Sequence, residues 1–426
     1  MIWLIALALL LVTVIGAPLF AVILAVALLG FYVRGIDLQA VAIEIYRIAD
    51  TPVLIALPLF TFAGYLLGES NTSSRLVRVT NAFLGWMPGG LAVVAFVACA
   101  LFTAFTGASG VTIVALGALL YPALKDSGYR ERFSMGLVTT SGSLGLLLPP
   151  SLPLILYGIV AEQMSTGGNV SVDALFRAGI LPCILMVVLL SGYGLWEHRK
   201  NPETGTKFSA GEAFASLKEA VWEIPLPFVV LGGIYGGYFA VSEAAAVTAM
   251  YVLVVEVLVY REISLSRLPG IMRESMVMVG GIMLILGVAM ASTNYLIDAQ
   301  VPAKLFAYIQ EHVASKIGFL VLLNIMLLVL GAILDIFAAI VIMVPLILPV
   351  ATSYGIDPVH LGIIFLANMQ IGYCTPPVGM NLFIASYRFK KPVAELYRAA
   401  LPFMLVLLAA LMVITYWPWL SLVFVR

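Results

Sequence analysis

The chain has 426 residues, of which 62% are apolar and only 10% are charged, and its mean hydropathy is +1.10. Soluble globular proteins carry roughly 25% charged residues, so this composition excludes a soluble fold and predicts an all-α polytopic membrane protein in a lipid bilayer. The 22 basic residues balance the 22 acidic ones, which gives no indication of a nucleic-acid partner.

Apolar stretches that could cross a bilayer, which takes about 20 residues, recur along the whole chain. Nine are expected, over residues 4–32, 52–67, 133–160, 174–196, 224–240, 244–260, 276–297, 361–387 and 400–424. Two further stretches, 91–124 and 318–351, would each be about 50 Å long as a helix, too long for an apolar core ~30 Å thick. Each is therefore predicted to fold back at its middle as a re-entrant helical hairpin. The tips fall at residues 106–110 (the first tip) and 331–335 (the second tip).

Two of the predicted spans contain residues that break helices at membrane depth. The first break (residues 145–151) holds Gly145, Pro149 and Pro150, and the second break (residues 372–381) holds Gly372, Pro376 and Pro377. Proline removes a backbone donor and pushes the preceding residue out of helical geometry. Unpaired backbone groups are costly in lipid, so broken helices at this depth are expected to line a cavity or a site.

An internal repeat with a shift of 227 residues relates these features. The shift carries Gly145 onto Gly372 and the pair Pro149-Pro150 onto Pro376-Pro377, and the start of the first hairpin onto the start of the second. We expect residues 1–200 to form the first repeat, with hairpin 91–124 and broken helix 133–160. Residues 224–426 form the second, with hairpin 318–351 and broken helix 359–387, and residues 201–223 are a cytoplasmic connecting helix.

The charges indicate that the two repeats are inverted. Sixteen of the 22 Lys and Arg residues fall in five loops that the predicted spans place on one side, which is cytoplasmic by the positive-inside rule. The loop 125–132 holds three of them, whereas its counterpart 352–359 holds none. Inverted repeats with broken helices that meet near the midplane are typical of secondary transporters.

The candidate substrate and ion site consists of the two tips and the two breaks. Its predicted residues are Thr106, Gly107, Ser109, Ser141, Gly145, Pro149, Pro150, Ser151, Gly331, Asp335, Asn368, Gly372, Thr375, Pro376, Pro377 and Asn381. Oxygen ligands suit a hard cation, and sodium is expected at Thr106, Ser109, Gly145, Asp335, Gly372 and Thr375. An anionic substrate would be held by helix N-termini, hydroxyl groups and the bound ion.

Simpler roles compete for several of these residues. Asp335, an intramembrane acid and therefore a functional candidate, could instead cap the second arm of its hairpin. The hydroxyls could bond only to their own backbone. Glu243 could cap a helix or contact another subunit, and the amphipathic stretches 75–87 and 303–316 could be stiff arms beside the hairpins or ordinary interfacial helices.

The chain resembles the large membrane subunit of tripartite ATP-independent periplasmic (TRAP) transporters, the DctM family, over nearly its whole length. The resemblance rests on several motifs in order: LPLFTFAGYLL at 57–67, FTAFTGASGVT at 102–112, GSLGLLLPPSLPLILYG at 142–158, SEAAAV at 242–247, GAILDIFAAIVIMVPLILPVA at 331–351 and GYCTPPVGMNLFIAS at 372–386.

That resemblance implies a multi-pass protein of the bacterial inner membrane that imports an organic acid with Na+ by an elevator-type movement. It also implies two partners, a small four-span DctQ-like membrane subunit and a DctP-like periplasmic substrate-binding protein. The alternatives are a stand-alone Na+/anion symporter or a Na+/H+ antiporter of related fold, although an antiporter would want a second intramembrane acid. An intramembrane enzyme would need a nucleophile with a base or a metal cluster at depth, so a transporter rather than an enzyme is expected.

Overall fold

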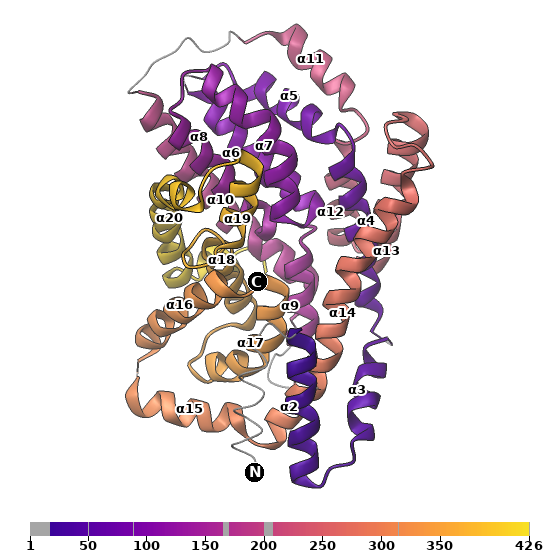
Figure 1. Ribbon diagram of the computed structural model, residues 1–426, viewed down its shortest axis with the longest axis vertical. Coiled ribbons are helices and arrows are strands. Elements are labelled where there is room, and N and C mark those ends of the chain that lie inside the picture. Colours follow the sequence, from indigo (N-terminus) through magenta and orange to yellow (C-terminus); the bar gives the residue numbers. More distant parts are fainter. Residues whose placement is uncertain are drawn as a thin grey trace.

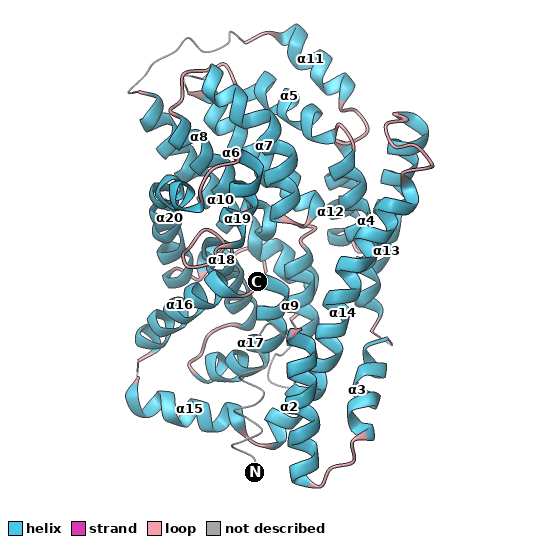
Figure 2. Cartoon of the chain, viewed as in Figure 1, coloured by secondary structure: helices cyan, strands magenta, loops and turns pink. Residues whose placement is uncertain are grey.

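The computed structural model describes residues 18–49, 51–87, 89–164, 170–199, 208–313 and 315–425. The described residues fold as helices joined by short loops, with no strand among them (Figure 2). Seven of these helices are long and apolar enough to cross a membrane, or eight when one bent pair is taken as a single span. This confirms the all-helical, multi-span prediction; residues 4–17 of the expected first span lie outside the described residues.

One group of helices packs along one side of the molecule (Figure 1). It comprises α2 (Leu19–Arg34), α3 (Gln39–Ala49), the short helix η1 (Pro52–Ile55), α4 (Ala56–Glu69), α12 (Pro225–Tyr235), α13 (Val241–Val254) with its π-helical continuation η3 (Val255–Val259), and α14 (Leu268–Asp298). Within this group, which we call the frame, α4 packs on α13 and α14, and α14 packs on α2 and α3.

The remaining core holds the two hairpin segments and the two broken segments. The hairpin segments are α6 (Gly90–Thr106) with α7 (Ser109–Asp126), and α16 (Lys316–Ile333) with α17 (Ile336–Ser353). The broken segments are α8 (Glu131–Ser141), the 3-10 turn η2 (Leu144–Leu147) and α9 (Leu152–Glu162), and α18 (Pro358–Gly372) with α19 (Met380–Phe389). Both Pro-Pro bonds, at 149–150 and 376–377, are cis.

Both predicted breaks are present, and the first bends its segment by 42°. The helix boundaries of the two halves also correspond under the 227-residue shift, which carries Thr106 onto Ile333 and Ser109 onto Ile336. The end of α7 at Asp126 corresponds to the end of α17 at Ser353.

Three amphipathic or connecting helices lie outside these segments. They are α5 (Thr72–Leu84) between α4 and α6, α15 (Val301–His312) between α14 and α16, and α11 (Ala210–Glu219) in the connecting segment. Two long helices, α10 (Val172–His198) and α20 (Val393–Tyr416), complete the fold with the short α21 (Trp419–Leu422). In Figure 1, α5, α8 and α11 lie at one end of the molecule and α15 at the other.

Ion pairs tie the basic loops to one another at the end that holds α5 and α11. Arg78 pairs with Glu212 at 2.8 Å and Lys391 with Glu131 at 3.1 Å, while the Arg132 guanidinium donates to the Arg398 carbonyl oxygen at 2.9 Å. Loops that are remote in sequence therefore share one face, as the expected sidedness requires.

The expected span 224–240 is wrong in length, because helix α12 covers only 11 residues. At 1.5 Å per residue it reaches about 16 Å, roughly half of the apolar core. Pro225 stands at its first position, and Gly237, at φ +72°, turns the chain left-handed just beyond its end. Pro and Gly at these two positions are characteristic helix boundaries, although the hydropathy of the stretch continues past both.

Two roles were considered for Glu243, a helix cap and a contact with another subunit, and the structure shows the helix cap. The backbone N–H of Ala240 donates to the Glu243 carboxylate at 2.9 Å, just before α13.

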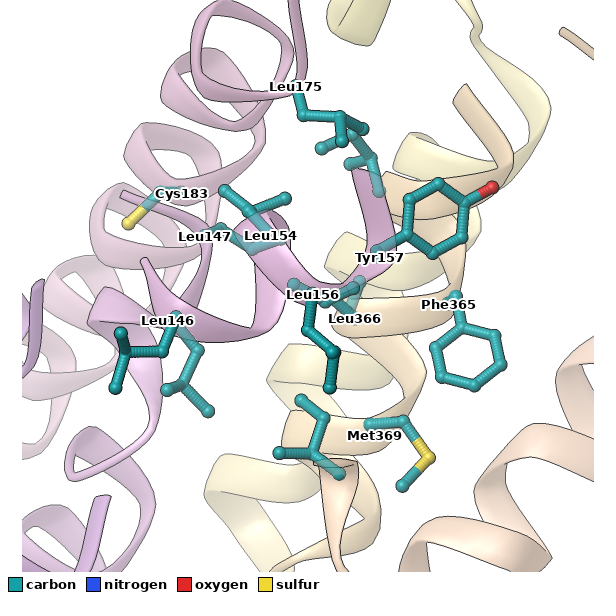
Figure 3. Close-up of a cluster of buried hydrophobic side chains, with 14 of the residues drawn as sticks. Leu146, Leu147, Leu154, Leu156, Tyr157, Leu175, Cys183, Phe365, Leu366 and Met369 are labelled. Atoms are coloured by element: carbon teal, nitrogen blue, oxygen red, sulfur yellow. The ribbon is translucent and has the colours of Figure 1, made fainter. Parts of the chain in front are cut away.

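The centre of the molecule is an apolar layer between α9, α10 and α18 (Figure 3). The rings of Tyr157 and Phe365 lie 6.4 Å apart, and the Tyr157 hydroxyl donates to the carbonyl oxygen of Pro358 at 2.7 Å. Every residue of α18 from Val359 to Gly372 is buried, although the helix carries polar side chains. The first broken segment and α18 are therefore enclosed by protein, as unpaired backbone at membrane depth demands, whereas Pro376 and Pro377 of the second break are exposed.

Candidate functional site

The first tip lies directly against the first break. Helix α6 ends at Thr106, and the next residue, Gly107, has a left-handed φ of +66° and leaves room for Leu152 because it has no side chain. The Thr103 hydroxyl contacts the carbonyl oxygen of Gly142 at 3.0 Å and the Thr112 hydroxyl at 2.8 Å, which links both arms of the hairpin to the end of α8. A side chain at Gly145 would collide with the backbone of Ala100 and Ala104. The backbone of the first break therefore packs directly on the backbone of α6.

The second tip lies against the second break in the same way. A Cβ atom on Gly372 would lie 2.5 Å from the Cα atom of Gly331. The hydroxyl of Tyr373 donates to Asp335 Oδ1 at 3.0 Å and accepts from the backbone N–H of Ile336 at 2.8 Å. The backbone N–H of Gly379 donates to the carbonyl oxygen of Ala332 at 3.1 Å.

The two broken segments also contact each other. The Ser143 hydroxyl donates to the carbonyl oxygen of Gln370 at 3.3 Å, and these two positions are 227 residues apart. The side-chain amide of Asn381 donates to the carbonyl oxygen of Thr139 at 3.4 Å, and the thiol of Cys374 lies 3.8 Å from that oxygen. The two tips and the two breaks thus form one connected region.

Four of the five predicted site hydroxyl groups already use their hydrogens in bonds to backbone carbonyl oxygens. Thr106 donates to the Phe102 carbonyl oxygen at 3.0 Å, Thr375 to that of Ile371 at 3.0 Å, and Ser141 to that of Val138 at 3.4 Å. Ser151 donates to the carbonyl oxygen of Leu146 and also caps α9. These hydroxyls keep lone pairs for a cation but cannot donate to an anion.

A hard cation fits the oxygen atoms that the region offers. Asn381 is fully buried, and its side-chain oxygen accepts no hydrogen bond from the described residues. Asp335 adds a carboxylate, although one of its oxygens accepts from the Phe337 backbone N–H at 3.0 Å as the N-cap of α17. Capping therefore occurs, and it leaves the carboxylate's remaining lone pairs available. No group of His, Cys, Asp and Glu within the described part of the chain could hold a metal ion.

Not every predicted residue faces the same point. The Asn368 amide donates to Asn324 at 2.7 Å, and Asn324 in turn contacts Thr415 of α20 at 3.3 Å. Thr375 contacts the sulfur of Met404, also on α20, at 3.5 Å. These two side chains point toward α20, and their recorded contacts do not involve either tip.

Sequence reasoning missed several residues of this region. Tyr373 joins the second tip to the second break, Thr139 receives the Asn381 amide, and Gln370 accepts from Ser143 through its backbone. Gln370 was visible as a polar side chain inside an apolar span, and Asn324 likewise within the second hairpin. No sequence signal marks Thr139, because its backbone carbonyl oxygen makes the contact.

A cavity of about 400 Å³ lies beside the first tip. It is lined on the frame side by Tyr65, Gly68, Glu69 and Glu274, and on the other by Gly110, Val111, Val114, Ala115 and Ile384. It separates α4 and α14 from α7 and α19.

The apolar helices of this fold define a multi-pass membrane protein. One solved structure, that of the Alcanivorax borkumensis YdaH transporter, described as having an unusual topology, matches 88% of this chain and 88% of its own with a TM-score of 0.60. Its sequence identity is only 16%, so the likeness concerns the fold alone.

The sequence matches the family described as the tripartite ATP-independent periplasmic transporter, DctM component, over residues 2–420, and the chain belongs to this family. It is 36% identical to the C4-dicarboxylate TRAP transporter large permease protein DctM of Pseudomonas aeruginosa, over 91% of this chain and 89% of that protein. It is 33% identical to the isethionate TRAP transporter permease protein DctMQ of Oleidesulfovibrio alaskensis, over 95% of this chain and 63% of that longer protein.

The resemblance seen in the sequence is thereby confirmed. The chain is the large permease of a TRAP transporter, a multi-pass protein of the inner membrane, and is not an enzyme.

Proposed function

We propose that this permease imports an organic acid together with Na+, and that both bind where the two tips meet the two breaks. The observation that carries the proposal is the contact between the two broken segments, with the buried, unpartnered oxygen of Asn381 and the carboxylate of Asp335 close to the second break. Neutral and anionic oxygens with few competing donors suit a monovalent hard cation.

The substrate's carboxylate would bind to helix N-termini. Helices α7, α9, α17 and α19 begin at Ser109, Leu152, Ile336 and Met380, each at a tip or just after a break. Their first backbone N–H groups lack partners within the helix and carry partial positive charge. Since no Lys or Arg lies in 91–124, 133–160, 318–351 or 361–387, these N–H groups and the bound cation would supply the positive potential.

The transport movement would be of the elevator type, with the two hairpins and broken segments moving against the frame. Helices α5 and α15 support this role, because each leaves a frame helix, α4 or α14, and leads into a hairpin. The correspondence of helix boundaries under the 227-residue shift supports two inverted repeats. The cavity toward Gly110 would then be the cytoplasmic release path.

Two further polypeptides would complete the transporter, a small four-span membrane subunit and a periplasmic substrate-binding protein. A relative named DctMQ, of which this chain matches 63%, is consistent with a separate small subunit here. Relatives are named for C4-dicarboxylate and isethionate, and we assign this chain to a carboxylate such as a C4-dicarboxylate, sialic acid or another sugar acid.

Uptake into proteoliposomes tests this function. The permease with its small subunit, a candidate binding protein and radiolabelled acid should accumulate substrate only when an inward Na+ gradient is present. Replacing Na+ by K+ should abolish accumulation. Equal uptake in both salts would overturn Na+ coupling, and uptake without any binding protein would favour the stand-alone symporter.

A further inference from the structure

A buried charge cluster lies far from the candidate site, between α5 and the frame. Arg75 of α5 is 5% exposed and is surrounded by Glu223 (3%), Glu256 (0%) and Glu262 (18%). The guanidinium also lies 4.1 Å from the ring centroid of Tyr260. One cation thus faces three carboxyl groups, two of them almost completely removed from water.

The guanidinium's hydrogen bonds go to two of the three carboxyl groups. Arg75 Nε donates to Glu223, while Nη1 and Nη2 both donate to Glu262. Glu262 also accepts from the backbone N–H of Asn71 at 2.7 Å, whereas the Tyr260 hydroxyl, 3.1 Å from Glu223, donates to the nearer carbonyl oxygen of Glu219 at 2.6 Å. Both carboxylates therefore accept a direct hydrogen bond from the guanidinium.

Glu256 is different, because only one hydroxyl reaches it. Its Oε1 lies 3.2 Å from Thr72 Oγ1, whereas its Oε2 accepts no hydrogen bond from any described residue and lies 3.7 Å from Arg75 Nη2. The π-helical turn Val255–Val259 fixes the side chain in this position at the end of α13. An ionised Glu256 would therefore be a buried charge with almost no hydrogen-bond donors, which is strongly unfavourable.

The hydroxyl groups near Thr72 have too few hydrogens to donate to an ionised Glu256 as well as to their other acceptors. Thr72 Oγ1 lies within hydrogen-bond distance of Glu256, of Glu223 at 3.3 Å and of Ser70 Oγ at 2.8 Å. The Ser70 hydroxyl donates to the Leu67 carbonyl oxygen at 3.1 Å. A threonine has one hydroxyl hydrogen, so at most one of these acceptors receives it. A proton on Glu256 Oε1 resolves the conflict, since it can donate to Thr72, which then donates to Glu223.

We propose that Glu256 is a proton-binding site and that its neutral carboxyl group holds α5 against α13 and η3. Loss of the proton would leave a second uncompensated charge at the junction through which α4 leads into the first hairpin. The junction would then loosen as the pH rises. This inference concerns the frame and is independent of Na+ coupling and of the substrate.

The pKa values of the two neighbouring carboxyl groups, Glu223 and Glu262, are shifted in opposite directions. Burial raises the pKa of Glu223, although Arg75 opposes this. Partial burial would raise the pKa of Glu262, but hydrogen bonds from Arg75 and Asn71 outweigh it and hold that pKa below its ordinary value. The titration of Glu262 therefore affects the stability of the protein only at acidic pH, below the range over which Glu256 is tested. Glu223 would act in the same direction as Glu256, so the experiment must separate these two.

Thermal unfolding of the purified permease in detergent, from about pH 6 to about pH 9, provides that separation. An acid that holds its proton more tightly when folded than when unfolded loses stability as the pH rises between its two pKa values. The wild-type midpoint should fall over this range, and Glu256→Gln, which keeps the neutral state, should flatten the fall by at least half. Glu223→Gln, the matched control, removes the carboxylate partner of Arg75 Nε and should lower the midpoint at every pH while keeping most of the slope.

Infrared spectroscopy gives a second readout that does not depend on stability. The wild type at neutral pH should show the carbonyl stretch of a protonated carboxyl group, and Glu256→Gln should lack it. If Glu223→Gln removes the slope or the band and Glu256→Gln does not, the proton belongs to Glu223 and the assignment is overturned. It is also overturned if neither substitution changes them, or if Glu256→Gln does not fold.

Discussion

Gly372→Ala should sharply reduce both the thermal stability and the transport activity of the permease. The added Cβ would lie 2.5 Å from the Cα atom and 2.6 Å from the carbonyl carbon of Gly331, and neither backbone atom can rotate away. Overpacking in a dense core costs about 1–3 kcal/mol, and a clash with backbone belongs at or above the upper end of that range. The expected result is a clearly lowered unfolding midpoint in detergent, with uptake reduced to a small fraction of wild type.

The matched control is Gly280→Ala in helix α14. A Cβ at Gly280 meets no atom within 4 Å, and alanine favours a helix over glycine by about 1 kcal/mol. This variant should therefore be as stable as the wild type or slightly more stable. If both variants behave alike, the second tip does not pack on the second break as described.

Asp335→Asn should weaken Na+ dependence while the protein still expresses and inserts. An asparagine oxygen can still accept the Phe337 N–H that caps α17, so the helix start is preserved. The change removes the only ionisable group of the second hairpin's helices and tip between residues 317 and 353. We expect the Na+ concentration for half-maximal uptake to rise about tenfold, which corresponds to about 1.4 kcal/mol.

Tyr373→Phe distinguishes the effect of the Asp335 charge from the effect of the hydrogen bonds at the second tip. It removes the hydroxyl that bridges Asp335 and the Ile336 backbone but leaves the carboxylate ionisable. It should lower the unfolding midpoint by a few degrees and change the Na+ requirement less than Asp335→Asn does. An unchanged Na+ requirement in Asp335→Asn would remove this carboxylate from the ion site.

Residues that act through backbone chemistry were the most predictable part of the molecule. The two Pro-Pro pairs prevent a continuous helix whatever surrounds them. A straight helix over 91–124 or 318–351 would be longer than the apolar core of the bilayer is thick. The breaks and the helix ends at Thr106 and Ile333 therefore followed from local rules. The length of α12 was misjudged because hydropathy averages over Pro225 and Gly237, whereas the backbone responds to each of them.

Contacts between remote segments could not be predicted in the same way. The pairing of Tyr373 with Asp335, and of Ser143 with Gln370, depends on how two broken helices cross, which no local pattern encodes. The cluster around Arg75 was even less predictable from the sequence. Its carboxyl groups come from residues 223, 256 and 262, and the sequence presents Arg75 only as one of several loop cations.

Equilibrium binding of radioactive sodium to the purified permease is the most direct test of a cation site between the second tip and the two breaks. Wild-type protein should bind Na+ saturably, and excess K+ should not displace it. Asp335→Asn and Asn381→Ala should each weaken binding about tenfold or more, while Glu243→Gln, at the distant cap of α13, should bind as the wild type does. Absence of saturable binding, or binding unchanged by both site substitutions, would contradict a sodium site at this position.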